Sequence, residues 1–233
     1  MLTEKIWSMA QIGAEWVLWV LVILSVISLS LIVERIIFLL KHRMDLDNAR
    51  EQLKLSLKQS GPTGALRHFS PEDNAQAAML CEALQAADGG SGAAEEAAAS
   101  VREQQKMTLE RGMIFLGTLG NNAPFIGLFG TVLGIINAFR DLASTQMSQA
   151  SARIMANISE ALVATAVGLL LAIPAVIAFN IFQRRVKKII AEGDALIHVL
   201  LSHLRAEEAA DPTFTVPVVL PGTQGRSSQN ESR

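Results

Sequence analysis

Three long runs of apolar residues that contain no charge dominate the pattern along this chain, at residues 16–33, 112–139 and 161–183. A helix needs about 20 mainly apolar residues to cross the roughly 30 Å hydrocarbon core of a bilayer. Each run is close to this length or longer, so the pattern predicts an all-α membrane protein with three transmembrane helices. We place these helices at residues 16–40, 112–139 and 160–183.

The first run differs from a secretory signal sequence. It is longer than a typical apolar signal core, and no cleavage site of small residues follows it. Glu34 and Arg35 come directly after it instead. We therefore expect the first helix to be retained.

The long segment 41–111 separates the first two runs and carries helix signals of its own. Ser70 followed by Pro71 and two acids predicts a helix start, with Ser70 as the N-cap and Pro71 at the first helical position. The glycines within 89–92 predict a stop and a hinge. Residues 93–111 contain no helix breaker, so we expect a helix that continues directly into the second membrane helix.

The third helix is predicted to extend beyond the membrane, over residues 184–210. Apolar residues recur there at helical spacing and form a stripe that needs a partner, most simply the helix before the second run. Residues 211–233 contain three prolines and a polar end, which predicts a disordered tail. The stripe consists of Val186, Ile189, Ile190, Leu196, Ile197, Leu200, Leu201 and Leu204.

Lysine and arginine flank the runs unevenly, and such residues collect on the cytoplasmic side of a membrane. One side offers only Lys5, Arg140 and Arg153 near the runs, so we expect residues 1–15 and a loop at 140–159 to lie outside. The segment 41–111 and the C-terminus are then cytoplasmic. Trp7, Trp16 and Trp19 all fall at the outer end of the first helix, as interfacial anchors do. The cytoplasmic flanks carry Arg35, Lys41, Arg43, Arg50, Lys54, Lys58, Arg184, Arg185, Lys187 and Lys188.

The composition and the absence of known motifs limit the kinds of binding and catalytic site that this chain can hold. The net charge of −2 does not indicate a nucleic-acid-binding surface. Cys81 is the only cysteine, which excludes an internal disulfide and fits a small apolar residue on a helix. No HExxH, P-loop or Cys/His cluster occurs, and no nucleophile and base pair lies in the runs. We therefore expect no metal, no cofactor and no enzymatic activity.

Small residues form one narrow stripe on each of the last two membrane helices. At 100° per residue, the stripe of the second helix falls within an arc of roughly 80°. Such stripes let membrane helices approach closely, and helix packing alone accounts for them as one reading. Pro124 and Pro174 also free backbone carbonyls, which can line a water-filled cavity. The stripes consist of Gly120, Pro124, Gly127, Thr131, Gly134 and Ala138, and of Ala161, Thr165, Gly168, Ala172 and Ala175.

Two threonines in these stripes point to a second reading, a proton pathway. Thr131 lies nine residues before Arg140, and Thr165 lies five residues after Glu160. Both are on the order of one to two turns inside the outer boundary, so we expect them to face each other across one cavity. Glu160 either snorkels to the interface or guards a wet path. A hydroxyl does not titrate near neutral pH, so another chain with a membrane helix would have to carry the proton.

The segments GNNAPFIGLFGTVLGIINAF and ISEALVATAVGLLLAIPAVIAFN resemble the two paired motifs of the ExbB/TolQ proton-channel family, which includes the more distant MotA. The resemblance covers residues 112–183 closely, and the earlier part in layout only. Asn121 and Asn122 depart from it, because they replace smaller residues. MANISEAL likewise replaces an APGIAEAL-like start of the third span.

The resemblance implies a motor subunit of the bacterial inner membrane, in a pentamer around the helices of an ExbD/TolR-like dimer. An aspartate of that partner carries the proton, and positions matching Thr131, Thr165 and Glu160 line its path. The proton motive force would then drive TonB-dependent transport, Tol-Pal function or gliding-type motility, through a TonB/TolA-like protein in the first two cases. The alternative that the residues leave open is a passive membrane scaffold.

Overall fold

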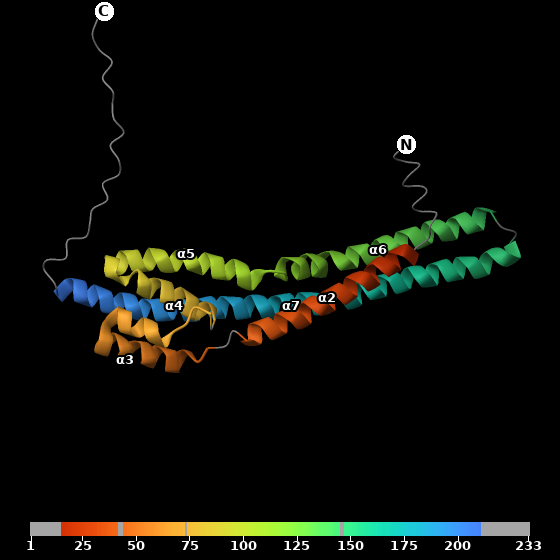
Figure 1. Ribbon diagram of the computed structural model, residues 1–233. Coiled ribbons are helices and arrows are strands. Elements are labelled where there is room, and N and C mark those ends of the chain that lie inside the picture. Colours follow the sequence, from red (N-terminus) through yellow and green to blue (C-terminus); the bar gives the residue numbers. More distant parts are fainter. Residues whose placement is uncertain (1–14, 42–43, 73, 145–146, 211–233) are drawn as a thin grey trace, which may run out of the picture.

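The computed structural model describes residues 15–41, 44–72, 74–144 and 147–210, and within these ranges the regular structure is entirely helical. The molecule is elongated, with α7 running along nearly its whole length (Figure 1). Residues 1–14 and the predicted tail at 211–233 lie outside the described residues, as does Trp7. The helices are α2 (Glu15–Lys41), α3 (Leu46–Ala65), α4 (Ala75–Gln85), α5 (Gly90–Glu110), α6 (Met113–Ser144) and α7 (Met147–Ala210), with 3₁₀ turns η1 (Leu66–His68) and η2 (Ala87–Gly89).

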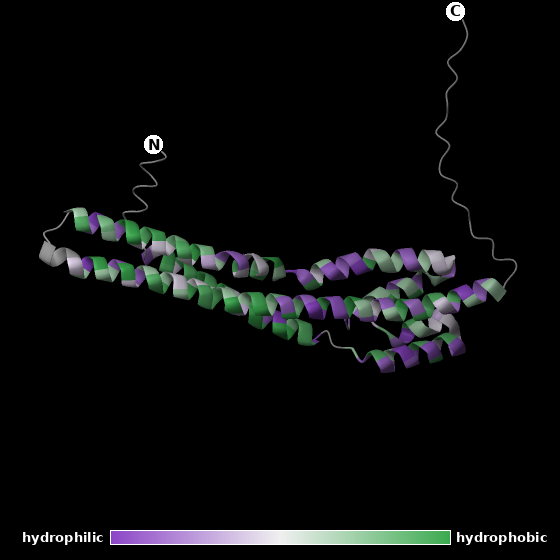
Figure 2. Cartoon of the chain, turned by 180° about the vertical axis from the view of Figure 1, so that it is seen from behind, coloured by the Kyte–Doolittle hydropathy of each residue, from purple (hydrophilic) through white to green (hydrophobic). Residues whose placement is uncertain are grey.

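Three of these helices, α2, α6 and the first part of α7, are long and apolar enough to cross a membrane by length and composition. They lie side by side and form what we call the span region, whose residues are mainly hydrophobic (Figures 1 and 2). Large side chains such as Ile23, Phe125 and Leu170 are exposed on it. A surface of this kind fits lipid as its solvent, so the prediction of three candidate membrane helices is confirmed.

The rest of the molecule, α3, α4, α5 and the last part of α7, forms what we call the end region. It has a buried core built on the apolar stripe of α7, from Val186 to Leu204, and every member of that stripe is buried. Helix α7 therefore continues past the third apolar run, as far as Ala210. Its partner is more than α5, because α3 and α4 also pack on α7.

The start of α4 differs from the prediction. The helix begins at Ala75, and the side chain of Asn74 caps it by accepting the Ala77 N–H over 2.8 Å. Ser70 instead accepts the Glu72 N–H in a preceding turn. Asn is as good an N-cap as Ser, and beginning at Ala75 confines the helix to a segment that is almost wholly buried.

Helix α3 was not predicted from the sequence. Its signal is Asp45, whose carboxylate accepts the Asn48 N–H as an N-cap. The helix is kinked at Gly61, where φ is 64°, directly before Pro62. It contributes Leu53 and other buried apolar residues to the end-region core.

The expected continuous helix from residue 93 into the second span is wrong at one point. Helix α5 ends at Glu110, and Gly112 takes a φ of 76° before α6 begins. Glycine adopts positive φ at little cost, which makes Gly112 the natural place for this break. Another positive φ, 89° at Gly90, lies at the start of α5, within the predicted hinge.

The segment 140–159 was expected to be a loop, but its described residues are helical. Helix α6 continues to Ser144 and α7 begins at Met147. The Asn157 amide donates to Asp141 over 2.9 Å and so joins the two helices beyond their apolar runs. We refer to this part of the molecule as the α6–α7 end.

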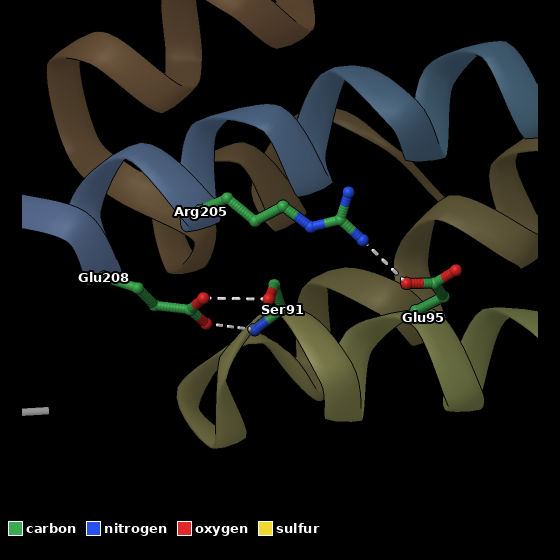
Figure 3. Close-up of polar contacts among 4 residues, drawn as sticks. All are labelled: Ser91, Glu95, Arg205 and Glu208. Carbon is green, nitrogen blue, oxygen red and sulfur yellow. Dashed lines mark hydrogen bonds and ion pairs between the residues drawn. The ribbon is translucent and has the colours of Figure 1, made fainter. Parts of the chain in front are cut away.

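Polar contacts tie the N-terminal turn of α5 to the last turns of α7 (Figure 3). Glu208 accepts hydrogen bonds from the backbone N–H and the hydroxyl of Ser91. Arg205 pairs with Glu95 over 2.9 Å. The Ser91 backbone hydrogen bond, followed by the Ser91 hydroxyl, holds the pKa of Glu208 below its usual range. We call these four residues the α5–α7 polar cluster.

Candidate functional site

Helices α6 and α7 pack so closely that their backbones touch. A Cβ added to Gly168 would lie 2.8 Å from the carbonyl oxygen of Ala123 and 3.1 Å from Cα of Gly127. A Cβ added to Gly127 would lie 2.9 Å from the carbonyl oxygen of Ala164. Only a residue without a side chain fits these positions, so the two small-residue stripes meet in one seam.

The other predicted packing residues lie along or beside this seam. Gly120 lies against Val176, and Gly134 lies against Ala161. Ala172 is buried in the cluster where α2 meets α6 and α7. Pro124 is half-buried within α6 and Pro174 is exposed within α7, and both helices continue across their prolines.

The structure brings Thr131 and Thr165 to one level of the seam. Gly130, the residue before Thr131, lies against Ala164, the residue before Thr165. The Thr165 hydroxyl donates across the seam to the carbonyl oxygen of Gly127 over 3.0 Å. The Thr131 hydroxyl donates to Leu128 of its own helix over 2.6 Å. Thr165 therefore contacts α6 directly at this level.

Both threonines lie on the side of the seam that faces away from α2. At 100° per residue, Thr131 is turned roughly 120° from Leu119 and roughly 160° from Leu133. These two leucines belong to the cluster that packs on α2. Thr165 is likewise turned roughly 120° from Leu171 of the same cluster. The pair thus shares one face of the α6–α7 pair.

The structure does not bring Glu160 to that face. It lines a cavity of about 370 Å³ on the side of α2, together with Glu15, Leu18, Trp19 and Val22. One Glu160 carboxylate oxygen is buried there and has no hydrogen-bond partner in the described part of the chain. Any wet path through Glu160 would therefore begin on the α2 side.

Glu15 is a residue of this cavity that sequence reasoning missed. It opens α2 and lies four residues before Trp19, so both project from the same face of the helix. That spacing could have indicated from the sequence that Glu15 and Trp19 share one side of α2. Its significance depended on α2 lying beside the start of the third span, which only the packing shows.

In the second and third apolar runs, the side-chain chemistry available is limited to hydrogen bonding. The runs 113–139 and 161–183 contain no acidic, basic or histidine side chain. Over the described residues, no group of three or more His, Cys, Asp or Glu side chains is placed to hold a metal ion. The hydroxyls of Thr131 and Thr165 can orient a water or a polar group on another helix, but neither gains or loses a proton near neutral pH.

A family model and several known proteins match parts of this chain. The model of the MotA/TolQ/ExbB proton channel family matches residues 71–194, which include α4, α5, α6 and most of α7. The chain is 51% identical over 104 residues to the Tol-Pal system protein TolQ of Pseudomonas aeruginosa, covering 42% of this chain and 44% of that protein. It is 47% identical over 96 residues to the biopolymer transport protein ExbB of Salmonella typhimurium, covering 41% and 39% of the two chains.

A longer match is found to ExbB of Xanthomonas campestris pv. campestris, at 36% identity over 135 residues. It covers 55% of this chain and 53% of that relative. The chain thus aligns with about half the length, or less, of these relatives. The family model itself spans more than half of the chain, and it includes the seam with both threonines. The chain therefore belongs to the MotA/TolQ/ExbB proton channel family.

Proposed function

We propose that this protein is the ring-forming subunit of a proton-driven motor in the bacterial inner membrane, and that it works with an ExbD/TolR-like single-span partner. The observation that carries the proposal is the shared face of Thr131 and Thr165, which lies away from α2 and has no titratable group beside it in the spans. A proton pathway along this face needs a carrier from another chain. A partner helix with an aspartate supplies one.

The position of these faces supports a ring arrangement of copies. Copies placed around an axis along the membrane normal, as in a homopentamer, would turn α2 outward and the threonine face inward. The partner helices would then occupy the centre, where the hydroxyls hydrogen-bond the aspartate or its water. One charge that crosses 100 mV releases roughly 2.3 kcal/mol, enough to bias one conformational step per proton.

In this proposal the end region lies in the cytoplasm and the α6–α7 end lies in the periplasm. The excess of lysine and arginine after the first and third runs supports that orientation. The chain itself catalyses no covalent reaction. Its output reaches an envelope process through the partner, either TonB-dependent transport, Tol-Pal function or gliding-type motility, and in the first two through a TonB/TolA-like protein.

Proton flux in proteoliposomes tests the proposal. The chain is co-purified with its single-span partner, and flux is measured with a pH-sensitive dye under an imposed potential. We expect Thr131→Val and Thr165→Val to retain the complex but lose most of the flux, since each removes a hydroxyl and keeps the shape. Thr108→Val is the matched control, because Thr108 makes the same kind of hydrogen bond within its own helix, outside the spans.

Normal flux in both variants would favour the passive scaffold instead. A purification that yields no single-span partner with a membrane aspartate would do the same. Glu160→Gln and Glu15→Gln examine the cavity beside α2 separately: if protons pass there, both variants lower the flux without altering the complex.

A further inference from the structure

Polar side chains lie exposed on the outer faces of the two seam helices. They are Thr118, Asn121 and Asn122 on α6, and Asn180 on α7. All four belong to the uncharged apolar runs. A polar group that faces hydrocarbon without a partner costs several kcal/mol, so these side chains need a polar neighbour.

The chain satisfies only part of this need. The Thr118 hydroxyl donates to Ile114 over 2.9 Å, and the Asn122 amide donates to the carbonyl oxygen of Thr118 over 2.7 Å. For the amides of Asn121 and Asn180, the described part of the chain offers no hydrogen-bond partner. The Thr118 oxygen also keeps its capacity to accept a hydrogen bond.

The two polar faces lie at opposite edges of the α6–α7 pair. At 100° per residue, Asn121 is turned roughly 120° from Gly127, which faces α7 in the seam. Asn180 is turned roughly 120° from Gly168, which faces α6. The α6 edge of one copy can therefore meet the α7 edge of the next copy. Such a head-to-tail contact generates a closed ring when the rotation between copies closes.

The depths of these side chains in the membrane also match. In the seam, Gly117 lies level with Phe179 and Gly120 with Val176, which puts Thr118 level with Ala178. Asn180 is two residues farther along α7, about 3 Å in depth at 1.5 Å per residue. Cβ atoms tilt toward the N-terminus of a helix, and α6 and α7 are antiparallel. The side chains of Thr118 and Asn121 therefore lean toward the depth of Asn180, and Asn180 leans toward them.

We infer that Asn180 of one copy hydrogen-bonds Thr118 and Asn121 of the next copy, and that this polar contact joins neighbouring subunits within the membrane. The inference rests on the proposed ring and names the residues that hold it. A second copy is the occupant because this chain supplies both halves of the contact, at one depth and on opposite edges. Lipid tails offer no hydrogen bond, and lipid packing would leave both amides unsatisfied.

Disulfide cross-linking in native membranes tests the contact. Cys81 is first replaced by Ala, and Thr118→Cys is combined with Asn180→Cys in the full chain expressed with its partner. Oxidation is expected to yield covalent dimers and higher oligomers, whereas either single substitution yields none. The control pair, Thr118→Cys with Ile158→Cys, also consists of exposed positions, but they differ in depth by about 30 Å and should not cross-link.

Oligomer stability supplies an independent readout. Asn180→Leu removes the amide at similar volume, and each interhelical hydrogen bond lost in a membrane lowers association about threefold. We expect dissociation of the purified ring at correspondingly higher protein concentration, as measured by native mass spectrometry. Asn180→Gln should restore part of the loss, and Ile181→Leu on the same helix should change nothing.

Two results would overturn the inference while leaving the motor intact. One is an undiminished ring in Asn180→Leu together with no cross-link between positions 118 and 180. The other is rapid labelling of both cysteines by a membrane-impermeant thiol reagent, which would show that these faces meet water. Proton flux through the complex decides the proposed function separately, since a ring joined by other residues would still conduct.

Discussion

The span region and the end region share one continuous helix, α7, yet they are held together differently. In the span region most of the large side chains face outward, and glycines bring the backbones of α6 and α7 into contact. In the end region most of the large side chains face inward, and the leucines and isoleucines of α7 are buried under α3, α4 and α5. The same helix therefore follows two packing rules along its length.

The difference reflects the solvent around each region. Water drives apolar side chains together, so the end region has an ordinary hydrophobic core. Lipid tails are as apolar as leucine, so burying a leucine in the span region gains little, and close backbone contact and interhelical hydrogen bonds take over. Thr165 shows the second rule, because its hydroxyl donates to a backbone carbonyl on α6.

Matched leucine substitutions break the comparison most directly. Leu200→Ala in the end region should destabilise the protein by about 2–5 kcal/mol, because the side chain is fully buried and leaves a cavity. Leu170→Ala on α7 should have almost no effect, because this side chain is 72% exposed on the lipid-facing surface. Thermal denaturation of the detergent-solubilised protein measures both, and equal losses would contradict the two-rule description.

Glycine substitutions test the seam. Gly168→Ala should cost about 1–3 kcal/mol, because its Cβ would meet the Ala123 carbonyl and the backbones would have to separate. Gly92→Ala in α5 is the control, since no atom lies within 4 Å of the added Cβ. The midpoint of thermal denaturation should fall for the first variant and stay constant or rise for the second.

The buried polar contact between α4 and α7 gives a smaller expected effect. The Gln76 amide, fully buried, donates to Glu192 over 2.9 Å. Gln76→Leu should cost about 1–2 kcal/mol, because the Glu192 carboxylate loses a hydrogen bond in a largely buried site. Gln85→Leu, on an exposed position of the same helix, should leave the denaturation midpoint unchanged.

The α5–α7 polar cluster gives the smallest expected effect. Because the folded-state pKa of Glu208 is lowered, its contribution to stability is present above the usual carboxyl pKa of 4.5 and is lost as the pH falls through the lowered value. The denaturation midpoint of Glu208→Gln should lie slightly below that of the native protein at pH 7, and the gap should close in acid. A difference in midpoint that persists at low pH would show that the hydrogen bonds from Ser91 do not depend on the charge of Glu208.

The sequence by itself determined the number of spans, the extension of α7 and the stripes that form the seam. The composition of a helix indicates whether lipid or water surrounds it. The spacing of its apolar and small residues indicates which face packs on a neighbouring helix. The seam glycines illustrate this well, since Gly127 and Gly168 were found from spacing alone and lie in backbone contact.

The tertiary structure decided which side of the α6–α7 pair each functional residue occupies. Glu160 and Thr165 are only five residues apart, yet Glu160 lies beside Glu15 in the α2 cavity while Thr165 faces away from α2. That separation depends on where a third helix docks, and helical period within α7 cannot report it. The break at Gly112 has the same origin, because a local helix signal does not show where two packed regions must change direction.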